Sequence, residues 1–327
     1  MVVLSWPRAR VLLLAAALSL VAGLTACRRA AEPPAAVEPG YRIVGQWGRT
    51  GSAPGEFDGV QGLAVDAQDR LYITDAENCR VQVFDTEGRF LRAWGRCGDG
   101  PGELRRPMDV AVDAAGRVFV VDFLLDRVVV FDRTGKFLQA WGRPGSGRGE
   151  LDSPVGAALD SSGNLYVTEF YNHRVQKFNP GGEPLLVRGG EGSETGKLHY
   201  PGKVSLAPDG TVYVADAHNY RIQKYDPQGG ALANWGSPGT WQGQFQDPVD
   251  VAVEPDGSFH VADSGNRRVQ WLSGKGEFLA EWRLPDQEGL KFESPSALTL
   301  GTDGSLYVSD IANNRIYKLE VVRGDRK

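Results

Sequence analysis

Residues 62–95 read GLAVDAQDRLYITDAENCRVQVFDTEGRFLRAWG and contain four short runs that are rich in apolar residues. The runs are Gly62 to Asp66, Leu71 to Asp75, Arg80 to Asp85 and Phe90 to Gly95. Each run is about five residues long, the usual length of a β-strand, and turn-forming residues separate the runs. None has the 3.6-residue period of an amphipathic helix. This stretch therefore predicts four antiparallel strands joined by tight turns.

The same pattern returns every 47 residues along the chain. An acidic residue ends the second predicted strand of each unit, and an arginine begins the third. The acids are Asp75, Asp122, Glu169, Asp216, Asp263 and Asp310, and the arginines are Arg80, Arg127, Arg174, Arg221, Arg268 and Arg315. Six units without an insertion or deletion indicate a repeat architecture. Because these residues occur in every unit, we interpret them as scaffold and not as one catalytic site.

Six units of four strands predict an all-β fold, a six-bladed β-propeller of four-stranded antiparallel blades. The sixth unit has no fourth-strand run, whereas residues 41–48 form such a run with no unit before it. We therefore expect the N-terminal strand to complete the blade formed by residues 295–320 and to close the ring without an open sheet edge. The predicted propeller domain spans residues 41–327.

The third unit carries the positions that name the NHL repeat, namely Glu169, Asn172, His173, Arg174 and Val175. The chain thus resembles an NHL-repeat propeller from residue 41 to residue 320. In propeller lyases that cleave peptidyl-α-hydroxyglycine and share this repeat, zinc-binding histidines follow the proline that opens the innermost strand. The corresponding residues of this chain are Gln61, Met108, Val155, Gly202, Val249 and Ser296. The resemblance therefore implies no zinc site of that kind.

The first 26 residues have the pattern of an export signal. Arg8 and Arg10 precede an apolar run, residues 11–21, that is too short to span a bilayer. Residues 24–27, Leu-Thr-Ala-Cys, resemble the lipobox of bacterial lipoproteins, which implies that residues 1–26 are removed and that Cys27 carries acyl chains such as palmitate. An ordinary cleaved signal peptide without lipidation is the alternative.

Residues 27–40 are rich in proline and alanine, and we expect them to form a semi-extended tether between the lipid anchor and the propeller. In lipoproteins of bacteria with two membranes, an aspartate after the lipidated cysteine favours retention in the inner membrane. Arg28 stands there in this chain, so the resemblance favours the outer membrane, facing the periplasm or the exterior. The expected protein is an exported, membrane-anchored component of the cell envelope.

Composition narrows the expected partners. The chain has 36 basic and 41 acidic residues and a net charge of −5, and it contains no basic run. An acidic chain of this kind is a poor binder of nucleic acid. We expect a monomer that binds a protein, peptide or glycan.

Three charged residues are candidates for a site in the central channel. Asp109, Lys203 and Asp250 occupy one repeat position in three blades, and that position should face the channel. Two carboxylates and a lysine could hold a divalent cation, as in lactonase-like propellers. A solvated channel without a ligand is the alternative, and we expect no other cofactor or metal.

Cys79 precedes the third strand of the first unit, and Cys97 follows its fourth strand. These two strands should form a hairpin that brings both cysteines close together. An exported compartment permits oxidation, so a disulfide is predicted, with two free thiols as the alternative.

Only residues that differ between units can make one part of the ring a binding site. The loops between the second and third strands are small or polar in four units, but those of units two and three are apolar or aromatic. They carry Phe123, Leu124, Leu125, Phe170 and Tyr171, flanked by Asp126 and His173. Such a patch often marks an interaction site. The alternative is that these side chains fold over the blade edge and are buried.

The leading functional hypothesis is a membrane-anchored binding or scaffold module that recognises its ligand on one face of the propeller. It rests on the export signal and on the absence of a recognisable catalytic constellation in the sequence. The runner-up is a metal-dependent hydrolase or lactonase that acts at the mouth of the channel. The pattern leans towards the binding module without deciding whether the protein is an enzyme.

Overall fold

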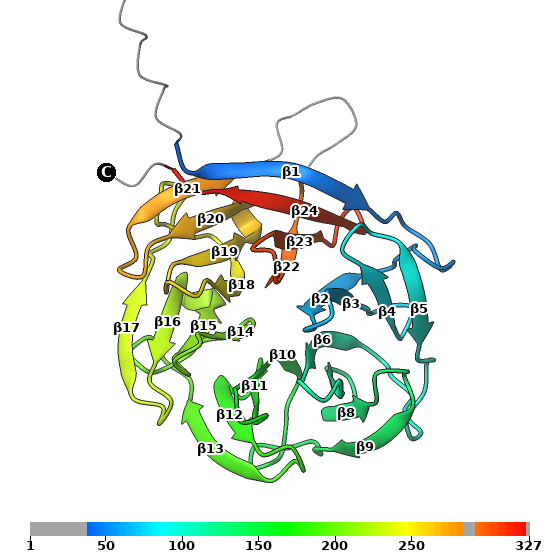
Figure 1. Cartoon of the computed structure of the whole chain (residues 1–327). Coiled ribbons are helices and arrows are strands. Elements are labelled where there is room, and N and C mark those ends of the chain that lie inside the picture. The colour runs from blue at the N-terminus through cyan, green and yellow to red at the C-terminus, as the bar shows by residue number, and fades with distance from the viewer. Residues whose placement is uncertain (1–37, 284–291, 325–327) are drawn as a thin grey trace, which may run out of the picture. The chain divides into compact units, whose positions relative to one another are not determined.

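The computed structural model describes residues 38–283 and 292–324. Six four-stranded antiparallel sheets are arranged in a ring around a central channel (Figure 1). The only helical segments in the described part of the chain are two short 3-10 helices, η1 (Ala217–Asn219) and η2 (Ser264–Asn266). The fold is the predicted six-bladed β-propeller.

Each blade runs outward from its innermost strand, which lies at the channel (Figure 1). Blade 1 consists of β2 (Val60–Val65), β3 (Arg70–Asp75), β4 (Arg80–Asp85) and β5 (Phe90–Trp94). Blade 2 consists of β6 (Pro107–Val112), β7 (Val118–Asp122), β8 (Arg127–Phe131) and β9 (Phe137–Trp141). Blade 3 consists of β10 (Pro154–Leu159), β11 (Leu165–Glu169), β12 (Arg174–Phe178) and β13 (Pro184–Gly189). Blade 4 consists of β14 (Val204–Leu206), β15 (Val212–Asp216), β16 (Arg221–Tyr225) and β17 (Ala231–Trp235). Blade 5 consists of β18 (Pro248–Val253), β19 (Phe259–Asp263), β20 (Arg268–Leu272) and β21 (Phe278–Trp282). Blade 6 consists of β22 (Pro295–Leu300), β23 (Leu306–Asp310), β24 (Arg315–Val322) and β1 (Gly40–Trp47). The predicted strands of the first unit agree with β2 to β5 to within two residues.

The ring closes through the first strand of the chain. β1 pairs antiparallel with β24, with Tyr41 opposite Val321 and Trp47 opposite Ile316, and a bulge interrupts the pairing between Ile43 and Gly45. The sixth sheet has the order β1-β24-β23-β22, so the N-terminal strand is the outermost strand of blade 6 (Figure 1). Closure removes the free sheet edge that an open ring would expose.

The repeated acid and arginine residues tie each blade to the link that precedes it. Asp75 accepts a hydrogen bond from the Asp58 N–H at 2.7 Å and forms an ion pair with Arg80 at 2.7 Å. Arg80 in turn donates to the carbonyl groups of Ser52 and Glu56 in the same link. The ion pair recurs in blades 3, 4 and 5, at Glu169, Asp216 and Asp263. In blades 2 and 6, Asp122 and Asp310 still accept a hydrogen bond from a link N–H, so the acids act as scaffold.

The two faces of the ring differ in the segments that they carry. We call the face with the links between blades and the loops between second and third strands the link face, and the opposite face the turn face. The first turn of most blades has a glycine with positive φ on the turn face, such as Gly116 at +82°, whereas blade 1 has Asp69 at +57°. Glycine reaches this conformation at lower cost than other residues.

The structure joins Cys79 and Cys97 in a disulfide, with the two Cα atoms 5.0 Å apart. Cys27, the signal segment 1–26 and most of the tether lie outside the described residues, so the predicted anchor stays a prediction. Within residues 38–283 and 292–324, no helix is long and apolar enough to cross a membrane.

Candidate functional site

The central channel contains the three charged residues that the sequence indicated. The Nζ atom of Lys203 lies 3.3 Å from Oδ1 of Asp109 and 4.0 Å from Oδ2 of Asp250. All three residues are buried, with at most 5% of their surface exposed. The Lys203 ammonium also donates to the backbone carbonyl oxygen of Gln61, so the lysine side chain reaches across the channel from blade 4 to blade 1.

Each channel carboxylate also holds the next blade in place. Oδ2 of Asp109 accepts a hydrogen bond from the Ala157 N–H at 2.9 Å, and Oδ2 of Asp250 accepts one from the Leu298 N–H at 2.8 Å. Burial raises the pKa of both carboxyl groups, and Lys203 opposes this effect. The negative charge of Asp109 adds to the shift at Asp250, whose pKa rises to about 7.

The candidate cation site thus lies next to a positively charged side chain of the protein. The ammonium group of Lys203 is within ion-pair distance of both carboxylates. Within the described ranges, no group of three or more His, Cys, Asp or Glu side chains is placed to hold a metal ion. A divalent cation in the channel therefore stays an untested prediction, and a cation would have to share the carboxylates with Lys203.

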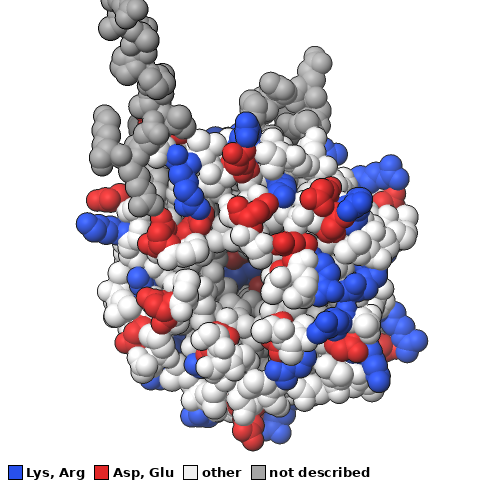
Figure 2. All heavy atoms as spheres, viewed as in Figure 1, with Lys and Arg blue, Asp and Glu red and all other residues white. Residues whose placement is uncertain are grey.

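The charged residues separate two cavities. A cavity of about 360 Å³ opens on the link face and is lined by Lys203 and Gln61, among others. A second cavity of about 210 Å³ lies on the other side and is lined by Asp109 and Asp250 but not by Lys203. Figure 2 shows the hollow at the centre of the ring with basic and acidic atoms inside it. A ligand on the link face therefore meets the ammonium side of this ion cluster.

The predicted patch lies on the link face beside the larger of these two cavities. Leu124 and Tyr171 are 53% and 54% exposed, whereas Phe123, Leu125 and Phe170 are half-buried. The rings of Phe123 and Tyr171 are 6.5 Å apart, so the patch crosses from blade 2 to blade 3. The structure thus brings the five predicted residues to one surface but exposes mainly two of them.

The patch continues into blade 4 through Tyr200. The ring of Tyr200 lies 4.8 Å from Phe170, 4.7 Å from His218 and 4.8 Å from His199. We define the aromatic cluster as Phe123, Phe170, Tyr171, His199, Tyr200 and His218. Phe170, Tyr200 and His218 also line the 360 Å³ cavity, so the cluster and the cavity form one continuous surface.

Asp126 and His173, which were expected to flank the patch, connect neighbouring blades. Oδ1 of Asp126 accepts a hydrogen bond from the Ser153 N–H at 2.7 Å. Nδ1 of His173 accepts one from the Tyr200 N–H at 2.9 Å, and His173 is 91% buried. Both residues support the surface from below.

Sequence reasoning missed Tyr200, His199 and His218 as part of the surface. A comparison of the links would have found the first two, because the corresponding pairs are Asp58 and Gly59, Arg105 and Arg106, Asp152 and Ser153, Gln246 and Asp247, and Glu293 and Ser294. Trp241 was missed as well, although it stands where the other links have small or polar residues. It is 79% exposed on the link between β17 and β18.

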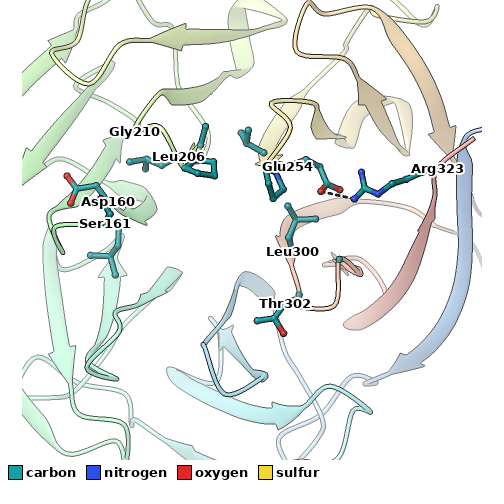
Figure 3. Close-up of a pocket in the computed structure, with 15 residues that line it drawn as sticks. Asp160, Ser161, Leu206, Gly210, Glu254, Leu300, Thr302 and Arg323 are labelled. Atoms are coloured by element: carbon teal, nitrogen blue, oxygen red, sulfur yellow. Dashed lines mark hydrogen bonds and ion pairs between the residues drawn. The ribbon is translucent and has the colours of Figure 1, made fainter. Parts of the chain in front are cut away.

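A separate cavity of about 400 Å³ opens on the turn face (Figure 3). The last residues of four innermost strands line it, namely Leu159, Leu206, Val253 and Leu300. Its charged groups are already paired. Glu254 lies 3.0 Å from Arg323 (Figure 3), and Asp160 lies 2.8 Å from Lys177.

Comparisons with known proteins agree with this architecture. Residues 56–130 match the family described as 6-bladed beta-propeller, and residues 151–178, 198–225 and 245–272 each match the NHL repeat. No curated protein sequence matches the chain.

Several solved structures are similar in fold. A streptogramin B lyase superimposes with a TM-score of 0.62 at 15% identity, covering 86% of this chain and 98% of that chain. Virginiamycin B lyase from Staphylococcus aureus gives 0.59 at 14% identity, covering 86% and 100%. A protein of unknown function from Bacteroides thetaiotaomicron gives 0.65 at 18% identity, covering 87% and 76%. At these identities the likeness concerns the fold alone. The chain contains three segments that match the NHL repeat, and it has the six-bladed β-propeller fold.

Proposed function

We propose that the chain is a binding or scaffold module, anchored to a membrane outside the cytoplasm through Cys27, that recognises a protein, peptide or glycan on its link face. The observation that carries this proposal is the aromatic cluster, whose exposed member Tyr171 lies 6.5 Å from the ring of Phe123 on the neighbouring blade. Aromatic side chains are enriched among the residues that dominate binding energy. The adjoining cavity of 360 Å³ is within the size range of small-ligand sites and could receive one group of the ligand.

The membrane part of the proposal is supported by the sequence around Cys27 alone. A lipid anchor followed by a tether would hold the propeller near the bilayer while leaving both faces of the ring accessible. Such an arrangement suits a module that presents one face to a partner in the envelope.

The surface can be tested with two matched pairs of substitutions. Leu124→Ser with Tyr171→Ser removes the two exposed side chains of the predicted patch. Leu138→Ser with Leu185→Ser is the control, because these leucines are each 45% exposed in the same two blades but lie on the outer strands β9 and β13. Envelope components cross-linked to the wild-type protein should be retained by the control pair and reduced more than about ten-fold by the link-face pair. Equal capture by both pairs would contradict the proposal.

The alternative function, a metal-dependent hydrolase or lactonase at the channel mouth, gives a different result. It requires a stoichiometric divalent cation in the purified protein and turnover of esters or lactones that a chelator abolishes. Asp109→Asn should then remove both the cation and the turnover, while leaving cross-linking at the link face intact.

A further inference from the structure

One repeat position lies at the junction between each blade and the link that enters the next blade. The position precedes the third strand and is occupied by Cys79, Asp126, His173, Tyr220, Arg267 and Asn314, all with φ between +47° and +56°. Three of these residues accept a hydrogen bond from a link N–H: Asp126 from Ser153 at 2.7 Å, His173 from Tyr200 at 2.9 Å, and Asn314 from Gly59 at 2.8 Å. The same joint is thus made with three different acceptors.

The three acceptors respond differently to acid. The amide oxygen of Asn314 does not titrate, and a carboxylic acid such as Asp126 keeps an acceptor oxygen when it is protonated. A neutral imidazole accepts through one nitrogen only, and both nitrogens become donors when the ring is protonated. Protonated His173 would therefore direct an N–H group at the Tyr200 N–H.

Tyr200 depends on this hydrogen bond because its backbone is in an unfavourable conformation. Its φ is +45°, in the left-handed region that bulky residues rarely adopt, whereas Gly59 has φ of +76° at the corresponding position of blade 1. Such a conformation is strained for a residue other than glycine and persists only where the surroundings hold it. The N–H···Nδ1 bond to His173 and the ring contact between the two residues, 4.5 Å between centroids, hold Tyr200 in place.

The surroundings of His173 favour the neutral ring at pH 7. Burial is the main cause that lowers its pKa, and His199 and His218 add to the effect. Glu191 in the link and Asp216 at the end of β15 oppose it without reversing it. The imidazole is therefore an acceptor at neutral pH and loses this role only below its lowered pKa.

We infer that the joint between blades 3 and 4 is a pH-sensitive element. Protonation of His173 breaks its hydrogen bond with the Tyr200 N–H, and Tyr200 then loses its contacts with the other residues of the aromatic cluster. Its consequence for ligand binding rests on the proposed function, because Tyr200 links Phe170 to His218 on that surface. The other two joints with an acceptor, at Asp126 and Asn314, stay closed in mild acid. Acidification would thus alter the link face at blades 3 and 4 and leave the rest of the ring intact.

Hydrogen exchange of the full chain, purified in detergent, tests this inference without a ligand. The protection factor of each amide, which is its rate relative to that of an unstructured peptide at the same pH, is measured at pH 7.5 and at an acidic pH below the midpoint of the His173 ring titration, which NMR of the same protein gives. Protection of the Tyr200 amide should fall about ten-fold in acid, as expected for the loss of one hydrogen bond. Protection of the Ser153 and Gly59 amides, held by Asp126 and Asn314, should change by less than about two-fold and serves as an internal control.

The variant His173→Asn isolates the titrating group. Asparagine already makes this joint at Asn314, so the variant should retain Tyr200 protection at both pH values. If the variant does not fold, an NMR titration of the His173 ring in the wild-type protein replaces it, and its midpoint should coincide with the loss of Tyr200 protection. Equal protection of Tyr200 at both pH values, or the same loss in the variant, would overturn the inference.

This experiment and the test of the proposed function fail independently. Exchange at Tyr200 is measured with no partner present, so it is unaffected by what the Leu124 and Tyr171 pair does to capture. If Tyr200 protection depends on pH while the Leu124 and Tyr171 pair captures as much as the wild-type protein, the proposed function is refuted. The inference about the joint is then still supported.

Discussion

The hydroxyl group of Tyr41 lies 2.7 Å from Nδ1 of His260, and this hydrogen bond connects the N-terminal strand of blade 6 with blade 5. On its other side, Nε2 of the buried His260 lies 3.0 Å from Oε1 of Glu254, which also forms an ion pair with Arg323 at 3.0 Å. Burial lowers the pKa of His260, so the ring is neutral; it donates from Nε2 to the Glu254 carboxylate and accepts from Tyr41. Both ends of the described propeller, near residues 41 and 323, thus meet at the hydrogen-bonded pair of His260 and Glu254.

Replacing Tyr41 by phenylalanine should destabilise the closed ring. The substitution keeps the ring of the side chain but leaves Nδ1 of His260 buried without its donor, which costs about 1–3 kcal/mol. Urea unfolding should show this decrease in the free energy of unfolding, with the same slope as the wild-type protein.

Tyr213→Phe is the matched control for this measurement. Tyr213 occupies the repeat position of His260 in blade 4 and is buried, but its hydroxyl has no hydrogen-bond partner within the described chain. Removing this hydroxyl should cost little or nothing. A Tyr41→Phe variant as stable as Tyr213→Phe would show that the hydrogen bond does not contribute to closure.

The Cys79–Cys97 disulfide closes a short loop within blade 1, with a sequence separation of 18 residues. A cross-link of this length stabilises a domain by about 3 kcal/mol, largely by restricting the unfolded chain. We expect the free energy of unfolding of a Cys27→Ser protein to fall by about this amount when a reductant is added. The same protein should show no titratable thiol before reduction, and two thiols would contradict the disulfide.

The fold could be predicted from the sequence because its signal is repeated six times in register. A wrong strand assignment in one unit would have differed visibly from the other five. The closing strand could be predicted as well, because residues 41–48 form a strand pattern with no unit before it. The binding surface has no such redundancy. It arises where single units depart from the repeat, and each departure is a single observation.

Contacts between units were the part that the sequence could not show. Tyr41 and His260 are 219 positions apart, and nothing in their local sequence indicates that they share a hydrogen bond. His173 was expected at the edge of a patch, but its partner Tyr200 belongs to the next link. The repeat predicts which positions face a neighbouring blade but not which hydrogen bond a particular residue pair forms.

Lipidation of Cys27 has a direct test. The variant Cys27→Ala cannot be acylated, so the protein should move from the membrane fraction to the soluble extract of the envelope, and labelling with radioactive palmitate should disappear. Several acyl chains anchor a protein stably, whereas their complete loss leaves no other membrane attachment in this prediction. A Cys27→Ala protein that stays in the membrane fraction would refute the lipid anchor as the means of attachment.

The buried carboxyl group of Asp250 should make stability depend on pH. Its pKa in the folded protein is about 7, against an ordinary value of 3.8, so the folded state binds more protons than the unfolded state between these two values. The free energy of unfolding should therefore fall as the pH rises from about 4 to 7. The lowered pKa values of His173 and His260 act in the opposite direction, but they do so equally in the wild-type protein and in a variant of Asp250.

The variant Asp250→Asn isolates this contribution. Its amide oxygen can still accept the hydrogen bond from the Leu298 N–H, but it does not titrate. The variant should be more stable than the wild-type protein above pH 7, by at most about 4 kcal/mol at 1.36 kcal/mol for each unit of pKa shift. The difference should shrink as the pH is lowered and become small near pH 4, where the carboxyl group is protonated in the folded state and about half protonated in the unfolded state. Urea unfolding of both proteins at pH 4.5 and pH 8 measures this difference, and a difference that is the same at both pH values would mean that the channel does not raise the pKa of Asp250.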